Sequence, residues 1–185
     1  TLKLKTAVVQ TAYANGASTT WLHSTGIHTV KTLTGVKNLH AAADNLLASH
    51  DCVVYFEGNG HGTVLFSERV KQTHPLLNEM VNECTGDALS DLFLALYILS
   101  DGSVTSWDGM YVDKPSRLSK VAVPNKHLFK SNPTDEEILV EPLGFQDKID
   151  EIVRNFKGAR AFVRPGGTED CVRVSVAAPL AADVD

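Results

Sequence analysis

The chain has 185 residues, of which 43% are hydrophobic and 21% are charged, and its formal net charge is −5. This composition is typical of a globular protein that is long enough for one large or two small cores. The acidic balance and the lack of a basic block argue against nucleic acid and anionic membrane surfaces as partners. No apolar run reaches the length of a membrane span, and residues 1–5 do not have the pattern of a signal peptide.

The first 115 residues alternate between strand and helix patterns. We predict strands over 5–9, 27–32, 52–56 and 63–66, a short helix capped by Ser18 or Thr19, and helices over 36–49, 67–84 and 87–99. Apolar side chains at helical spacing form one face of the last helix: Leu89, Leu92, Phe93, Leu96 and Leu99. This alternation predicts a mixed α/β layered domain.

The remaining residues predict a smaller domain, with the boundary in the Lys114-Pro115-Ser116 loop. A strand over 119–123, a helix over 145–156 and two strands on either side of residues 164–170 indicate a helix over an antiparallel sheet. The predicted fold class is therefore α/β, with a layered domain at 1–115 followed by a small α+β domain at 116–185.

The three cysteines, Cys52, Cys84 and Cys171, are odd in number and lack the spacing of a metal site. Cys52 and Cys171 lie in apolar runs. We therefore expect free and mostly buried thiols, and a reducing compartment, which favours the cytoplasm.

Residues 164–170 read Arg-Pro-Gly-Gly-Thr-Glu-Asp and lie between two predicted strands. Gly166 and Gly167 allow a sharp turn whose N–H groups converge, and Thr168 adds a hydroxyl. Arg164 and Arg173 add forked positive charge, which suits phosphate. The pattern alone is equally compatible with a hairpin turn that carries two solvated arginines.

Residues 57–62 read Glu-Gly-Asn-Gly-His-Gly and form a second candidate site. The carboxylate of Glu57 can accept from two hydroxyls, and the amide of Asn59 can donate and accept. The alternative is a turn in which Asn59-Gly60 supplies positive φ angles and no ligand binds.

These two motifs, together with residues 8–16, 34–40 and 86–91, resemble in the same order the α-D-phosphohexomutases, in particular the phosphoacetylglucosamine mutase branch. The phosphate loop of that family is Arg-Pro-Ser-Gly-Thr-Glu, and the sugar loop of the branch is usually Glu-Ala-Asn-Gly-His-Gly. The glucose and mannose branches carry Glu-Met-Ser-Gly-His, so Asn59 indicates the N-acetylglucosamine branch.

The resemblance implies two sets of ligand-binding residues. The sugar hydroxyls would contact Glu57, Gly58 and Asn59, and the phosphate would contact Arg164, Pro165, Gly166, Gly167, Thr168 and Arg173. Of the further candidates, we expect His61 to line the site rather than carry a proton, and we leave Lys37 unassigned. Because Gly166 stands where the family has serine, we expect a weakened phosphate site that a serine there would strengthen.

The resemblance also implies what this chain lacks. The family reaction needs a nucleophilic serine loop and a Mg²⁺ loop, and neither motif is in the sequence, so we predict no catalytic residue and no metal ligand here. The parent enzyme would interconvert N-acetylglucosamine 6-phosphate and 1-phosphate with Mg²⁺, towards UDP-N-acetylglucosamine. Its amino-terminal domains would be the protein partner, and the carboxyl-terminal helix would be shortened.

Two alternatives remain: a non-enzymatic phosphosugar-binding module, and another hexose-phosphate mutase branch.

Overall fold

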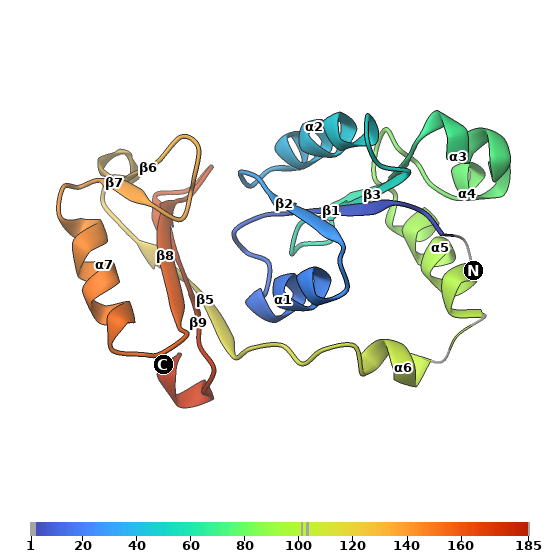
Figure 1. Ribbon diagram of the computed structural model, residues 1–185. Helices are drawn as coiled ribbons and strands as arrows, with labels where there is room; N and C mark the ends of the chain where they lie inside the picture. Colours follow the sequence, from blue (N-terminus) through green and yellow to red (C-terminus); the bar gives the residue numbers. More distant parts are fainter. Residues whose placement is uncertain (1–2, 101, 103, 185) are drawn as a thin grey trace. The chain divides into compact units, whose positions relative to one another are not determined.

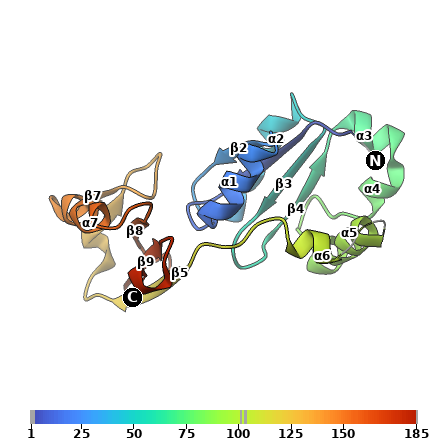
Figure 2. The ribbon, with the colours of Figure 1, turned by 60° about the horizontal axis from the view of Figure 1, so that its bottom comes forward.

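The computed structural model describes residues 3–100, 102 and 104–184. The chain divides into two compact units, Thr1–Ala14 with Ser18–Val112, and Asn15–Ala17 with Asp113–Asp185 (Figures 1 and 2). The division lies near the boundary expected from the sequence, whereas the assignment of one unit to sugar and the other to phosphate stays a prediction. None of the helices in the described residues is long and apolar enough to span a membrane.

The first unit is built on a four-stranded sheet with the order β2-β1-β3-β4. The strands β1 (Thr6–Gln10), β2 (His28–Lys31) and β3 (Cys52–Phe56) run parallel, and β4 (Gly62–Phe66) returns antiparallel to β3. The crossover helices are α1 (Gly16–Ser24) and α2 (Val36–Leu47), and Figure 1 shows them on opposite sides of the sheet. That placement follows from right-handed crossovers that step in opposite directions.

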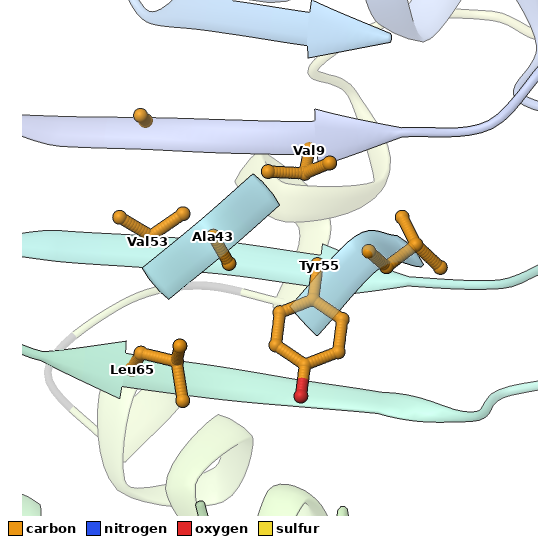
Figure 3. Close-up of a cluster of buried hydrophobic side chains, with 7 residues drawn as sticks. Val9, Ala43, Val53, Tyr55 and Leu65 are labelled. Atoms are coloured by element: carbon orange, nitrogen blue, oxygen red, sulfur yellow. The ribbon is translucent and has the colours of Figure 1, made fainter. Parts of the chain in front are cut away.

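One face of this sheet packs against α2. The alternate residues Val9, Val53, Tyr55 and Leu65 are almost completely buried there, and Ala43 of α2 packs onto them (Figure 3). The period-two alternation of strands explains why these positions share a face. The first turn of α1 departs from the prediction, because Asn15 caps it by accepting a hydrogen bond from the Ala17 amide at 3.0 Å.

The other face of the sheet packs against three helices, α3 (Glu68–Thr73), α4 (Pro75–Glu79) and α5 (Ala88–Ser100). The single helix predicted over 67–84 is wrong, because a proline at position 75 cannot continue the preceding turn. Burial on this face raises the pKa of the Cys52 thiol to about 12. Cys52 is a free, buried thiol, as the sequence predicted.

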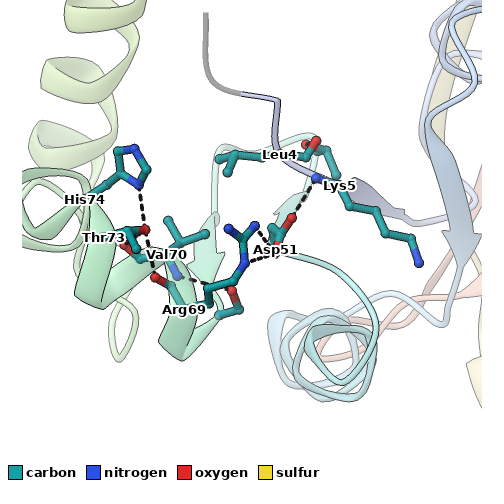
Figure 4. A network of polar contacts seen from close by, with 9 residues as sticks. Leu4, Lys5, Asp51, Arg69, Val70, Thr73 and His74 are labelled. Atoms are coloured by element: carbon teal, nitrogen blue, oxygen red, sulfur yellow. Dashed lines mark hydrogen bonds and ion pairs between the residues drawn. The ribbon is translucent and has the colours of Figure 1, made fainter.

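The Asp51 carboxylate fastens α3 to the start of β1. It accepts from the Lys5 amide at 3.0 Å and pairs with the Arg69 guanidinium at 2.7 Å (Figure 4). The Arg69 hydrogen bond is the main reason that the pKa of Asp51 lies below its usual range. This network stabilises the edge of the sheet at the amino ends of the parallel strands, which is the edge opposite to their carboxyl ends.

Helix α5 begins at the predicted cap, since Asp87 accepts from the Leu89 amide at 3.0 Å. The predicted apolar face is present on this helix. Within the described residues only Leu94 of this helix is buried, whereas most of the predicted face is exposed: Leu89, Leu92, Phe93 and Leu96. A short helix that the sequence patterns did not indicate, α6 (Val104–Asp108), follows it.

The second unit confirms a helix over an antiparallel sheet. The sheet has the order β5-β9-β8, formed by β5 (Ser116–Ala122), β9 (Cys171–Ala177) and β8 (Arg160–Pro165), and α7 (Phe145–Arg154) covers one face. A small ladder of β6 (Lys130–Ser131) and β7 (Leu139–Glu141) and two 3-10 turns, η1 (Lys126–Leu128) and η2 (Ala181–Asp183), complete it.

We expect Gly62→Ala to destabilise the first unit by at least about 1–3 kcal/mol, because overpacking has this cost. A Cβ at position 62 would lie 2.0 Å from the Tyr55 carbonyl oxygen, and backbone cannot move as a side chain can. Urea denaturation measures the change. Gly58→Ala is the matched control, since a Cβ there meets nothing within 4 Å; equal stability of the two variants would contradict this packing.

Candidate functional site

The Glu57–His61 segment lies at the end of the sheet where polar loops gather. The strands β1, β2 and β3 are parallel, so their carboxyl ends share one edge, and this segment follows β3 directly. Ligands in α/β sheets bind preferentially outside the carboxyl ends of the strands. The sequence motif is therefore at the edge of the sheet where a ligand site is expected.

The segment forms a tight hairpin connection between β3 and β4. The Gly60 amide donates to the Glu57 carbonyl at 2.9 Å, and the Glu57 amide donates to the His61 carbonyl at 2.8 Å. Gly60 has a φ of 88°, which favours glycine, while no described non-glycine residue has a positive φ. The Asn59 backbone therefore does not adopt the positive φ angle of the ligand-free turn interpretation.

The structure brings the side chains of Glu57 and Asn59 together. The Asn59 Nδ2 donates to Glu57 Oε2 at 3.2 Å, and Asn59 Oδ1 accepts from the His61 amide at 2.9 Å. The His61 Nδ1 lies 4.0 Å from the same carboxylate oxygen, on a side chain that is 73% exposed. The Glu57 carboxylate therefore has two polar neighbours and keeps acceptor capacity for hydroxyl groups. Lys37 is exposed in the first turn of α2.

The Pro165–Cys171 segment is the turn of the β8–β9 hairpin in the second unit. The Gly166 amide donates to the Cys171 carbonyl at 2.8 Å and closes the turn. The strand register places Arg164 directly opposite Arg173, and Arg173 directly opposite Lys120 of β5. Opposite residues of an antiparallel sheet share a face, so three cationic side chains form one row across three strands.

The cationic row is only partly neutralised. Arg164 Nε lies 3.5 Å from Glu136 Oε2, and Lys120 pairs with the Glu169 carboxylate. The hydrogen bond from Lys120 is the main reason that the pKa of Glu169 lies below its usual range. Within the part of the chain that the structure describes, the Arg173 guanidinium makes no hydrogen bond or ion pair.

The turn adds further donors beside this row. Among the described residues, no acceptor bonds to the amides of Gly167 and Thr168, both of which are exposed. The Lys126 Nζ donates to the Gly167 carbonyl at 2.7 Å. Unbonded turn amides and cations without a carboxylate partner are groups that can bind an anion.

Sequence patterns did not indicate Lys120 or Lys126, because both are remote from the turn in the sequence. The sequence predicted a strand at 119–123 that includes Lys120. It did not indicate which strand would be the neighbour of this one. For Lys126 no signal was available, since its approach to Gly167 depends on the turn after β5.

A serine at position 166, which we expected from the sequence to strengthen the phosphate site, would meet a steric obstacle in this turn. Gly166 is buried, and a Cβ there would lie 2.7 Å from Cys171 Sγ and 3.0 Å from the Glu169 carbonyl oxygen. The thiol therefore occupies the space that a larger residue needs. Gly166 and Cys171 are a matched pair in this turn.

A hollow of ≈ 660 Å³ in the first unit is a weaker candidate. Its lining includes Arg69, Lys71 and Glu83, and these charges already have partners: Lys71 bonds to Glu83 at 2.8 Å and Arg69 to Asp51. No cluster of three His, Cys, Asp or Glu side chains suited to a metal ion occurs in the described residues.

The sequence and the fold of this chain are similar to those of phosphoacetylglucosamine mutases. The family described as "Phosphoacetylglucosamine mutase AMG1, domain III" matches residues 1–76. Phosphoacetylglucosamine mutase 1 of Schizosaccharomyces pombe is 43% identical over 187 residues, which cover 90% of this chain and 35% of the relative. The human phosphoacetylglucosamine mutase is 38% identical over 192 residues, which cover 92% and 34%.

The structural similarity extends over nearly the whole chain. Aspergillus fumigatus N-acetylphosphoglucosamine mutase in complex with GlcNAc-6P and magnesium matches with a TM-score of 0.88 and 40% identity, over 99% of this chain and 37% of that chain. An N-acetylglucosamine-phosphate mutase of the α-D-phosphohexomutase superfamily, in its substrate complex, matches with the same score at 39% identity. The chain thus spans about a third of the length of the curated relatives it matches.

We expect Glu57→Gln to weaken phosphosugar binding about fivefold while the stability changes by less than about 0.5 kcal/mol. A hydrogen bond to a charged acceptor exceeds a neutral one by about 1 kcal/mol, and glutamine keeps an oxygen for Asn59. Titration calorimetry and thermal denaturation measure the two effects. Glu79→Gln on α4 is the control for loss of charge. Lower stability with unchanged affinity would mean that Glu57 only shapes the turn.

We expect Gly166→Ser alone to destabilise the second unit by about 1–3 kcal/mol, because its Cβ overlaps the Cys171 thiol. Adding Cys171→Ala should recover part of this loss, so the two substitutions should not be additive. Denaturant unfolding of both single variants and the double variant gives the coupling. Additive effects would show that the thiol does not restrict position 166.

Proposed function

We infer that this chain, which belongs to the phosphoacetylglucosamine mutase family of the α-D-phosphohexomutase superfamily, is the sugar- and phosphate-binding part of such an enzyme. The observation that carries this function is the cationic row beside the turn at residues 165–171. Arg164, Arg173 and Lys120 face one another in register, and Arg173 has no anionic partner among the described residues.

A phosphate group supplies what this arrangement lacks. Its oxygens can accept from the amides of Gly167 and Thr168, from the Thr168 hydroxyl and from the forked guanidinium of Arg173. A sugar hydroxyl alone would not neutralise the row. We therefore propose that Arg164, Pro165, Gly166, Gly167, Thr168 and Arg173 form the phosphate-binding loop.

We propose that the sugar ring binds at the loop that carries Glu57, Gly58 and Asn59. The Glu57 carboxylate accepts from ring hydroxyls, and the exposed Gly58, with no neighbour near its missing side chain, allows close approach. Asn59 bonds within the loop and positions Glu57, and its amide keeps one N–H and one lone pair with which it can reach the sugar.

In the whole enzyme, we propose, these two loops hold N-acetylglucosamine 6-phosphate and 1-phosphate while a phosphoserine and Mg²⁺ of the remaining domains carry out phosphoryl transfer. Such transfer requires charge neutralisation by a metal and in-line positioning of the reacting oxygens. The described residues offer no acidic cluster that would hold Mg²⁺, so we assign the metal to the rest of the enzyme.

The exposed surface of α5 supports a partner within the same enzyme. Leu89, Phe93 and Ile98 are each more than 60% exposed on a helix whose described outer surface carries no charged side chain. A helix that is hydrophobic on all sides is normally buried in a larger protein. We propose that the amino-terminal domains, present in the longer relatives, cover this surface. A role in UDP-N-acetylglucosamine synthesis and a cytoplasmic location are part of the same proposal.

The main alternative is a binding module without a catalytic partner, and a second is another hexose-phosphate mutase branch. Both keep the phosphate site. Comparison of N-acetylated with plain hexose phosphates tests the branch, because the proposed site should prefer the acetylated sugar.

We expect the purified 185-residue chain to have no mutase activity, because it lacks the nucleophile and the metal ligands. A coupled assay with Mg²⁺ and a sugar bisphosphate primer measures turnover. Addition of the amino-terminal domains of a related mutase, expressed separately, should restore it.

The control is the same mixture with Arg173→Ala, which should show much less turnover. Activity of the isolated chain would contradict the assignment of catalysis to another part. Absence of turnover in the mixture, together with intact phosphosugar binding, would favour the binding module.

A further inference from the structure

The segment after β5 is built to hold one lysine against the turn at residues 165–171. The Asn125 side chain accepts from the His127 amide at 2.9 Å and caps η1. Phe129 then anchors the segment in the core of the second unit by an edge-to-face contact with Phe145. Before η1, the Val123 amide donates to the Asp170 carbonyl at 3.1 Å, so the segment is tied to the turn itself.

Lys126 extends from this fixed segment to the turn. Its Nζ lies 2.7 Å from the Gly167 carbonyl oxygen, a neutral acceptor. Two other lysines of the second unit do have carboxylate partners, Lys120 with Glu169 and Lys130 with Glu141. In the described part of the chain no carboxylate pairs with Lys126. An ammonium group has three donors, and the Gly167 carbonyl uses one of them.

Lys126 and Arg173 share one acidic neighbour in the turn, Glu169, which itself pairs with Lys120. Both cations lower the pKa of Glu169, after the larger effect of Lys120, so both are near the same carboxylate. The amide of Gly167, whose carbonyl binds the lysine, has no acceptor among the described residues. The Lys126 ammonium group therefore lies beside a turn in which the amides of Gly167 and Thr168 have no acceptor among the described residues.

We propose that Lys126 is a further phosphate-binding residue, whose Nζ contacts the phosphate of the phosphosugar from the side of the turn formed by Gly167. This inference rests on the proposed function of the turn. The lysine contributes a compact positive charge with two remaining donors, whereas Arg173 contributes a planar fork of donors. The carbonyl of Gly167 keeps the amine in place before the ligand arrives, which reduces the entropy lost on binding.

A purely structural role makes a different prediction. If Lys126 only steadied the Gly167 carbonyl, its removal would lower the stability of the second unit and affect every ligand of the turn equally. A direct contact instead affects only ligands that carry a phosphate. It also depends on positive charge, which an arginine preserves.

The test is titration calorimetry of the 185-residue chain with three probes: N-acetylglucosamine 6-phosphate, inorganic phosphate and unphosphorylated N-acetylglucosamine. The variants are Lys126→Met, Lys126→Arg and, as matched control, Lys130→Met, which removes the same charge from the same unit. We expect Lys126→Met to weaken binding of both phosphate probes about tenfold or more, because the bond lost is charge-assisted. Lys126→Arg should retain most of the affinity, and the control should retain all of it.

Each result either supports or overturns the proposed role of Lys126. Phosphate affinity of Lys126→Met equal to that of the parent chain would overturn the role of Lys126 and leave the proposed function intact. An equal loss for the unphosphorylated sugar, or a loss in Lys126→Arg as large as in Lys126→Met, would also overturn it. Failure of the parent chain to bind either phosphate probe would overturn both proposals. Should Lys126→Met unfold, the Lys126→Arg variant and the salt dependence of its affinity give the answer.

Discussion

The core of the second unit enforces an unfavourable contact between two arginines that we propose bind phosphate. Val163 and Val174 face each other in register and pack beneath α7, and the next pair along the hairpin is Arg164 and Arg173 on the opposite face. A shift of one residue would move the valines out of the core, so the register cannot relax to separate the arginines. Like charges opposite each other destabilise a sheet. Burial of the valines therefore keeps the guanidinium groups of Arg164 and Arg173 on one face, in the arrangement that we propose binds an anion.

The first unit uses a similar division between a rigid sheet and a polar edge. The buried positions of β3 and β4 fix the hairpin, and Gly62 allows the backbone of the two strands to approach closely. The Glu57 carboxylate then projects from a short connection with internal hydrogen bonds. In both units a local turn carries the groups that we propose bind the ligand, while the hydrophobic core of the unit determines where those groups lie.

The parts that local patterns control were predictable. The structure confirms the strand predicted at 52–56 and the alternation of Val172, Val174 and Val176 with Arg173. Both were predictable because a buried run or face of a strand gives a pattern among residues that are close in the sequence. Lys120 and Lys126 were not predictable, since strand pairing and a remote turn bring them to the site. The apolar face of α5 was predicted but its exposure was not, because periodicity identifies an apolar surface but not the chain that covers it. The fit of Gly166 to Cys171 was not predictable, because it depends on packing across the turn and not on a local sequence pattern.

The most direct test of sugar binding at residues 57–61 and of phosphate binding at residues 165–171 is an NMR titration of the ¹⁵N-labelled chain with N-acetylglucosamine 6-phosphate. We expect the largest amide shifts at Gly167 and Thr168, whose N–H groups have no acceptor in the described structure, and at residues 57–61. Inorganic phosphate should reproduce the first group of shifts and not the second. Shifts that are confined to other parts of the two units, or a saturating ligand that leaves Gly167 and Thr168 unperturbed, would contradict the account.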